Sequence, residues 1–211
     1  MSQTAQKTIK PNNSGTKHMF RNPIIERLSR THIMVPITIL TLAAIGIIYW
    51  GLSNGLITVL PLIGLFFTGM IIFSLIEYLV HRYLFHMIPS TPTREKFQYA
   101  VHGVHHEFPK DKDRLAMPPI MSASISVVLF FLFRLIMGNA VYGFLPGFLV
   151  GYCAYLGVHY VVHAYQPPKN FFKVLWIHHG IHHYKDHERA FGVSSPLWDY
   201  IFRSMPKQGS K

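Results

Sequence analysis

The sequence of 211 residues contains a single cysteine, Cys153, and two long stretches without charged residues. One cysteine excludes an intrachain disulfide and argues against a metal site built from thiolates. No Asp, Glu, Lys or Arg occurs between residues 33 and 76, or between residues 115 and 133. Apolar runs of this length are long enough to cross a bilayer. The missing charge therefore predicts an integral membrane protein.

Acidic residues are also scarce, with 9 Asp and Glu against 20 Lys and Arg, which gives a formal net charge of +11. The basic residues gather in the N-terminal segment, the central hydrophilic loop and the C-terminal segment, and are almost absent near Ser53 and Gly138. Basic residues favour the cytoplasmic side of a membrane. This distribution predicts four spans with both termini in the cytoplasm, a surface suited to anionic lipid headgroups, and no nucleic-acid partner.

We predict an all-α integral membrane fold of four transmembrane helices with a cytoplasmic helical cap that holds a histidine-rich di-metal site. The polar residues 1–20 are expected to form a disordered tail, followed by a single membrane domain over residues 21–211. A short basic interfacial helix should begin at Asn22 and Pro23. The apolar runs place the spans at about 33–50, 56–78, 120–137 and 144–163.

Ten of the 14 histidines fall into four clusters, each at a border between an apolar and a charged stretch. Ten imidazoles exceed the four to six ligands of one metal ion, so they predict two ions in one cavity. In each His-x-x-His-His unit the outer pair shares a helix face and the middle residue points about 100° away from its neighbour. The candidate ligands, which are also the candidate catalytic residues, are His81 and His86; His102, His105 and His106; His159 and His163; and His179, His182 and His183.

The spacing of the first cluster is irregular, because five residues on an α-helix rotate a side chain by about 140°. His81 and His86 can share one ion only at a helix end, a bulge or a bend. Outside the clusters, His18, His32 and His187 are expected to be structural or interfacial, and His178 is ambiguous because it adjoins the fourth cluster out of register.

All-nitrogen ligation suits iron, zinc or copper. Zinc would support hydrolysis, whereas a pair of irons would activate dioxygen. A site that opens onto acyl chains favours iron, since only a strong oxidant attacks hydrocarbon. Two other classes of membrane protein are distant alternatives. A haem carrier predicts single histidines facing each other across the bilayer, and a metal transporter needs polar residues through the bilayer core.

The motif residues resemble the fatty acid hydroxylase (sterol desaturase) superfamily, and within it most of all the fatty acid 2-hydroxylases. The resemblance covers roughly residues 77–202. It is carried by Glu77-Tyr-Leu-Val-His-Arg-Tyr-Leu-Phe-His86, His102-Gly-Val-His-His106, Asp113-Arg-Leu115 with Pro118-Pro119, and Phe191-Gly-Val-Ser-Ser195 with Trp198-Asp199. The last two blocks narrow the resemblance to the fatty acid 2-hydroxylases, because the histidine spacing alone is also found in sterol oxidases and carotenoid hydroxylases.

The resemblance implies 2-hydroxylation of a long-chain fatty acyl group, free or in a sphingolipid or ceramide, with O2 as co-substrate. It implies two iron ions, although zinc can occupy such sites. Sterol or carotenoid hydroxylation and desaturation remain alternatives within the same superfamily. Carried over by motif position, the first ion would be held by His81, His86, His102, His106 and His182, and the second by His105, His159, His163, His179 and His183.

The sequence departs from the family pattern in two places. Relatives often carry a fused cytochrome b5-type domain, and no His-Pro-Gly-Gly motif occurs before residue 77. We therefore expect a separate electron donor, cytochrome b5-like or ferredoxin-like, with its reductase. This favours a bacterial inner membrane, with the endoplasmic reticulum as the alternative. Relatives also often have Asp where this chain has Leu156.

Several residues near the clusters are candidates for supporting roles. Glu77, an acid inside an apolar run, is a candidate to hydrogen-bond a ligand imidazole. Asp113 and Arg114 are candidates either to position the substrate carboxylate or to form a structural pair, and the pair is favoured. Tyr160 and Tyr184 flank ligands and are candidates to line the pocket, and Trp198 is expected to anchor the chain at the interface.

Overall fold

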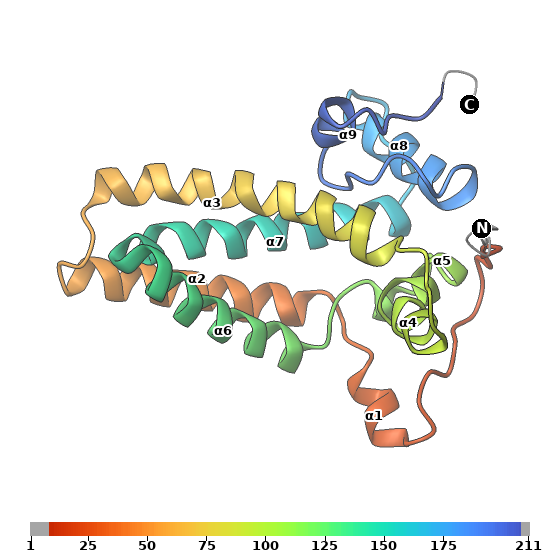
Figure 1. Ribbon diagram of the computed structural model, residues 1–211, viewed down its shortest axis with the longest axis horizontal. Coiled ribbons are helices and arrows are strands. Elements are labelled where there is room, and N and C mark those ends of the chain that lie inside the picture. Colours follow the sequence, from red (N-terminus) through yellow and green to blue (C-terminus); the bar gives the residue numbers. More distant parts are fainter. Residues whose placement is uncertain (1–8, 208–211) are drawn as a thin grey trace.

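The computed structural model describes residues 9–207, and all regular structure within this range is helical. The long helices lie side by side in an elongated bundle, and the short helices gather at one end of it (Figure 1). The long helices are α2 (Met34–Ser53), α3 (Val59–Leu79), α6 (Pro119–Met137) and α7 (Val141–Ala164). The short helices are α1 (Pro23–Leu28), α4 (Pro92–Gln98), α5 (Val104–Glu107), α8 (Lys173–Tyr184) and α9 (Leu197–Ile201).

Within residues 9–207, three helical stretches are long and apolar enough to cross a membrane. They are Met34–Ser53, Val59–Phe85 and Lys112–Ala164. The third stretch contains both α6 and α7, which the 3-10 turn η4 (Gly138–Ala140) joins almost without a break. Large apolar side chains on these helices face outward, such as Leu60 with 81% and Leu135 with 85% exposure. An outward apolar surface of this kind suits lipid, and it confirms the expected membrane protein.

Glycines allow α3 and α7 to pack backbone against backbone. Gly143, Gly147 and Gly151 recur every four residues along α7 and all face α3. A Cβ atom added at Gly147 would lie 1.8 Å from the Phe66 carbonyl oxygen, so no side chain fits there. Small residues at this spacing are typical of close helix pairs in membranes. The close approach brings the C-terminal ends of α3 and α7 together at the end of the bundle where the short helices lie (Figure 1).

The helix boundaries differ from the expected spans by a few residues. α2 continues to Ser53, and α7 begins at Val141 instead of residue 144. The reason at α7 is the tightness of the preceding turn, because Gly138 has a left-handed φ of +57° and reverses the chain within three residues. The short α1 begins where the sequence predicts, with the Asn22 side chain accepting hydrogen bonds from the Ile24 and Ile25 amides.

Residues 9–20, part of the expected disordered tail, form no helix or strand but contact the short helices. The Asn12 amide donates to the Glu107 carbonyl at 2.7 Å, and Lys17 pairs with the Glu107 carboxylate at 3.5 Å. The Tyr184 hydroxyl of α8 donates to the Asn13 side chain at 2.6 Å. The N-terminal segment therefore lies across α5 and α8. Residues 1–8 of the expected tail lie outside the described residues.

Candidate metal centre

The ten clustered histidines converge into two groups at the end of the bundle. Within each group, one ligand atom from every residue lies within 4.8 Å of the others. All ten are buried except His86 and His163, which are partly exposed. The membership is the same as in the two ligand sets that the resemblance implies. The first group is His81, His86, His102, His106 and His182, and the second group is His105, His159, His163, His179 and His183.

A π-helix explains how His81 and His86 reach the same group. The segment η1 (Val80–Phe85) continues α3 with wider turns, and the His86 amide donates to the His81 carbonyl at 3.2 Å. This five-residue hydrogen bond places the two rings on one side, with centroids 5.1 Å apart. A second π-helix, η2 (Tyr99–Gly103), carries His102. The irregular spacing in the sequence is therefore a helix bulge, one of the forms that it predicts.

Each His-x-x-His-His unit divides its side chains between the two groups. His102 and His106 belong to the first group and His105 to the second. On α8 the outer pair, His179 and His183, belongs to the second group, and the middle histidine points to the first. α5 and α8 therefore lie between the groups, and each supplies ligands to both, as the geometry of a helix predicts.

The separations of the ring nitrogens fit shared metal ions. The Nε2 atom of His102 lies 3.0 Å from that of His81 and 2.9 Å from that of His106. In the second group the Nε2 atoms of His105 and His159 are 2.9 Å apart. Two nitrogens bound at about 2.1 Å to one ion and at right angles to each other lie about 3.0 Å apart. The observed spacing is thus that of neighbouring ligands around one ion.

Unsatisfied buried nitrogens support the same interpretation. Both ring nitrogens of His86 and of His183, and Nε2 of His182, are buried without a hydrogen-bond partner. Leaving a buried polar atom unpaired is costly, and natural proteins rarely do so. A metal ion in each group would satisfy one nitrogen of each of these rings, so the residues present fit the two metal ions that the family pattern implies.

Burial keeps the imidazoles of these groups neutral. It lowers the pKa of His102, His105 and His106 well below the usual 6.5, and the neighbouring imidazoles lower these pKa values further. Burial likewise lowers the pKa of His86 to about 2. Metal ligation requires neutral imidazole, so at neutral pH the side chains are already in the form that binds an ion.

Two ligands of the first group are oriented by backbone carbonyls. Nδ1 of His81 donates to the Phe191 carbonyl at 2.5 Å, and Nδ1 of His182 donates to the Arg189 carbonyl at 2.8 Å. A hydrogen bond from Nδ1 fixes the tautomer in which the opposite nitrogen, Nε2, carries the lone pair. Nε2 of both rings is therefore available to an ion.

Two expectations for supporting residues are corrected by the structure. Glu77 contacts no ligand imidazole, because its carboxylate accepts hydrogen bonds from the Val193 and Ser194 amides at 2.8 and 3.0 Å. Arg114 pairs with Glu26 and Asp111 and not with Asp113. The amide partners of Glu77 and the Glu26 partner of Arg114 lie far away in the sequence, which is why local spacing could not identify them.

The structure also gives the contacts of the three aromatic residues. The Trp198 indole donates to the Ser74 hydroxyl at 3.0 Å, and this hydrogen bond links α9 to α3. Tyr184 lines a cavity beside the second group, as expected. Tyr160 packs against Tyr165.

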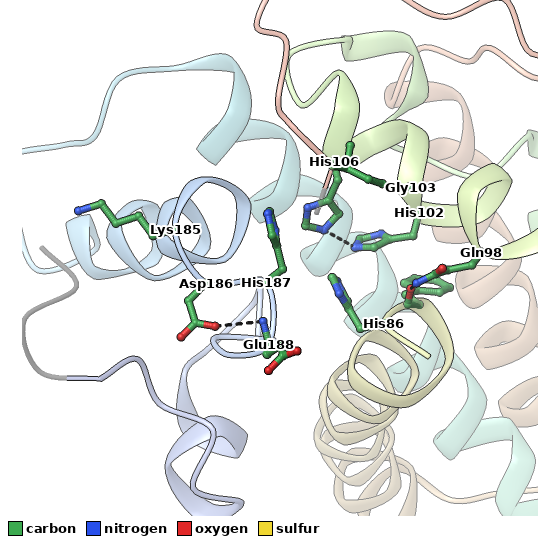
Figure 2. A pocket seen from close by; sticks show the side chains of 11 residues that line it. His86, Gln98, His102, Gly103, His106, Lys185, Asp186, His187 and Glu188 are labelled. Carbon is green, nitrogen blue, oxygen red and sulfur yellow. Dashed lines mark hydrogen bonds between the residues drawn. The ribbon is translucent and has the colours of Figure 1, made fainter. Parts of the chain in front are cut away.

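Two cavities open onto the two groups from different sides. The first, of about 230 Å³, reaches His86, His102 and His106, and residues 185–188 form its opposite wall (Figure 2). The second, of about 300 Å³, reaches His163, His179 and His183 and is lined by Lys110, Trp176 and Tyr184 among others. Each group of imidazoles therefore has its own access from the surface.

The comparison with known proteins identifies the family of this chain. A family model described as fatty acid hydroxylase matches residues 66–204, which include all ten histidines. The chain belongs to the fatty acid hydroxylase family. This confirms the membership expected from the motif residues.

Among the hydroxylases that the chain resembles, a fatty acid 2-hydroxylase of Rattus norvegicus is 42% identical over 148 residues, covering 68% of this chain and 40% of that protein. A ceramide very long chain fatty acid hydroxylase, scs7, of Schizosaccharomyces pombe is 33% identical over 197 residues, covering 90% of this chain and 55% of that protein. A solved structure described as full-length scs7p, with only the hydroxylase domain visible, aligns with a TM-score of 0.80 at 31% identity, covering 89% of this chain and 71% of that one. The chain thus spans about half or less of the length of these curated relatives.

One buried acid near the first group, Asp199, has no role assigned to it in the sequence interpretation. Asp199 is fully buried and accepts hydrogen bonds from the Phe191 amide at 2.9 Å and from His178 at 2.9 Å. The hydrogen bond to Asp199 also settles the ambiguous role of His178. This histidine is held by the Asp199 carboxylate and belongs to neither group. The sequence feature that could have indicated a buried role for Asp199 is that it is the one acidic residue after Glu188.

Proposed function

We propose that this chain is a membrane di-iron monooxygenase that hydroxylates carbon 2 of long-chain fatty acyl groups, either free or in a sphingolipid or ceramide. The observation that carries the proposal is the pair of five-imidazole groups in a chain that is 42% identical over 148 residues to a fatty acid 2-hydroxylase. One oxygen atom of O2 enters the C–H bond next to the carboxyl carbon, and the other leaves as water after two electrons and two protons are taken up.

The first group would hold one iron and the second group the other. When bound, the iron pair supplies the oxidising power that activates O2 for attack on a C–H bond. Iron accepts up to six ligands, so five imidazoles leave room for a ligand that the protein does not supply. The chain contributes neutral imidazoles, fixed tautomers at His81 and His182, and a buried site from which bulk water is largely excluded.

The topology that we propose has four spans, α2, α3, α6 and α7, with the short helices as a cytoplasmic cap and both termini in the cytoplasm. α6 has 19 residues and α7 has 24, and each is long enough at about 1.5 Å per residue to cross about 30 Å of hydrocarbon. The basic segments flank the cap end of the bundle, in agreement with the positive-inside rule. The membrane would be the inner membrane in a bacterium, or the endoplasmic reticulum in a eukaryote.

The two electrons would come from a separate cytochrome b5-like or ferredoxin-like protein with its reductase. Exposed lysines near the metal centre support this part of the proposal, since a basic surface attracts an acidic redox protein. Lys185 lines the first cavity and Lys110 the second, and both are exposed.

The test is lipid mass spectrometry of cells that express the wild type, a His105→Ala variant or a His32→Ala control, together with a candidate electron donor. His32 is exposed and belongs to neither group. The wild type and the control should add one oxygen at carbon 2 of long acyl chains, and His105→Ala should not. A wild type that binds metal but modifies sterols or carotenoids, or that only desaturates acyl chains, would overturn the proposed reaction.

A further inference from the structure

The segment 189–194, between α8 and α9, touches the first group of histidines and not the second. Its carbonyls at Arg189 and Phe191 accept the Nδ1 hydrogen bonds of His182 and His81. In the second group, Nδ1 of His105, of His179 and of His183 is buried without a hydrogen-bond partner, and the backbone contact of His159 is with Leu115, outside the 189–194 segment. The 189–194 segment therefore supports two imidazoles of the first group and none of the second.

Asp199 fixes this segment with a fully used carboxylate. One oxygen, Oδ1, accepts from the Phe191 amide at 2.9 Å and the Ser204 hydroxyl at 2.7 Å. The other, Oδ2, accepts from the Gly192 amide at 2.7 Å and from His178 at 2.9 Å. Burial alone would raise the pKa of Asp199, but these hydrogen bonds lower it below its ordinary value. The carboxylate is thus ionised and holds the carbonyl-bearing segment in place.

Glu77 fixes the other end of the segment from α3. It is buried with 8% exposure, and Oε1 accepts from the Val193 and Ser194 amides. Oε2 accepts from the Ser194 hydroxyl at 2.5 Å. Glu77 lies one helical turn before His81. The helix that carries a ligand of the first group therefore also holds the segment that orients this ligand.

The backbone between the two carbonyls is strained. Ala190 is fully buried and has a left-handed φ of +59°, a conformation that residues with a side chain avoid. Such conformations persist only where the surroundings determine them fully, and they gather at functional sites. Gly192 is tightly enclosed as well, because a Cβ atom there would lie 2.2 Å from the Ser195 carbonyl oxygen and 2.9 Å from the Asp199 carboxylate. The segment has no freedom to adopt another path.

We propose that Asp199 and Glu77 are positioning residues for the first metal ion alone, acting through the 189–194 segment on His81 and His182. This inference rests on the proposed di-metal function. It predicts that the two sites are unequal, with the first ion held more tightly than the second. Outer contacts of this kind change metal affinity by roughly 10- to 100-fold when they are removed, so the effect is large enough to measure at a single site.

The experiment measures zinc affinity in purified full-length chain in detergent, with zinc bound per chain determined at graded free concentrations. Variants with a single remaining site separate the two ions: His105→Ala disables the second group, and His86→Ala disables the first. Asp199→Asn should weaken zinc binding roughly 10- to 100-fold in the His105→Ala background. It should leave zinc binding unchanged in the His86→Ala background.

Two further variants and one control keep the test decisive if Asp199→Asn does not fold. Ser204→Ala removes one hydrogen bond to Asp199 together with the contact between the Ser204 and Tyr78 hydroxyls, and Glu77→Gln alters the other carboxylate. Both variants should weaken the first site selectively. Glu26→Gln changes a buried carboxylate that also accepts two backbone amides but lies outside the 189–194 segment, and it should leave both sites intact. Equal weakening of both sites, or unchanged affinity in all these variants, would overturn the inference. A wild type that binds no zinc and no iron would instead overturn the proposed function.

Discussion

The substitution Gly147→Ala tests how far the site depends on the close packing of α3 and α7. The added methyl group would lie 1.8 Å from the Phe66 carbonyl oxygen and 2.6 Å from its carbonyl carbon. The obstacle is backbone, which cannot rotate away as a flexible side chain can. A normal carbon–oxygen contact needs about 3.3 Å, so the two helices would have to separate locally by about 1.5 Å.

This separation has a cost that can be estimated. A gap of about 1 Å already loses up to half of the attraction between two packed atoms, and inserting a methyl group into a packed interior costs about 1–3 kcal/mol. We expect about 3 kcal/mol for Gly147→Ala because the clash is with backbone. For a chain of this length, that lowers the melting temperature by roughly 6–12 °C.

The assay is thermal unfolding in detergent, with Gly64→Ala as the matched control on α3. No heavy atom lies within 4 Å of a Cβ atom added at Gly64, so alanine there gains up to about 1 kcal/mol of helix propensity. Gly147→Ala should also bind less zinc, since η1, which continues α3, carries His81 and α7 carries His159. If the two variants melted at the same temperature, the backbone contact between these helices would not be a determinant of stability.

Three further predictions concern the cap. Ala190→Gly should raise stability by about 0.5–1 kcal/mol in thermal unfolding, with metal content unchanged, since glycine removes the strain of a left-handed residue; a loss of stability would contradict the strain. Burial would raise the pKa of Glu26, but amide hydrogen bonds and Arg114 lower it from 4.5 to about 2. The stabilising effect of the Glu26 carboxylate is therefore complete above about pH 4.5 and is lost as the pH falls towards 2. The stability of Glu26→Gln should for this reason fall less steeply with acid than that of the wild type. Identical acid-unfolding curves would argue against this role. Removal of metal by a chelator should lower the melting temperature, because an ion at 1,000 times its dissociation constant contributes about 4 kcal/mol; an unchanged temperature would mean that neither ion supports the fold.

The sequence predicts those features that depend on local spacing. Membrane helices follow from charge-free apolar runs, and the division of each His-x-x-His-His unit follows from the turn of a helix. The five-residue spacing of His81 and His86 likewise requires a bulge, and the structure has a π-helix there. These features need no knowledge of what packs against them, so a single sequence is sufficient.

Features that depend on distant partners could not be predicted in the same way. Glu77 was expected to reach an imidazole, but its partners are amides 116 and 117 residues later in the chain. Arg114 pairs with Glu26, 88 residues earlier. The glycine contacts between α3 and α7 depend in the same way on which helix lies opposite. In each case the residue type signals a buried role, and only the three-dimensional fold determines the partner.

The position of α8 has a consequence for how the protein is made. Each group takes histidines from both halves of the chain, and His183 lies 77 residues after His106. At about 5–20 residues per second, the ribosome needs about 4–15 s to cover that distance. The earlier histidines therefore wait at the membrane surface as partial sites until α8 emerges. Partial imidazole sites bind copper and zinc more tightly than iron, so the metals available in the cell during these seconds should decide which ions the finished protein carries.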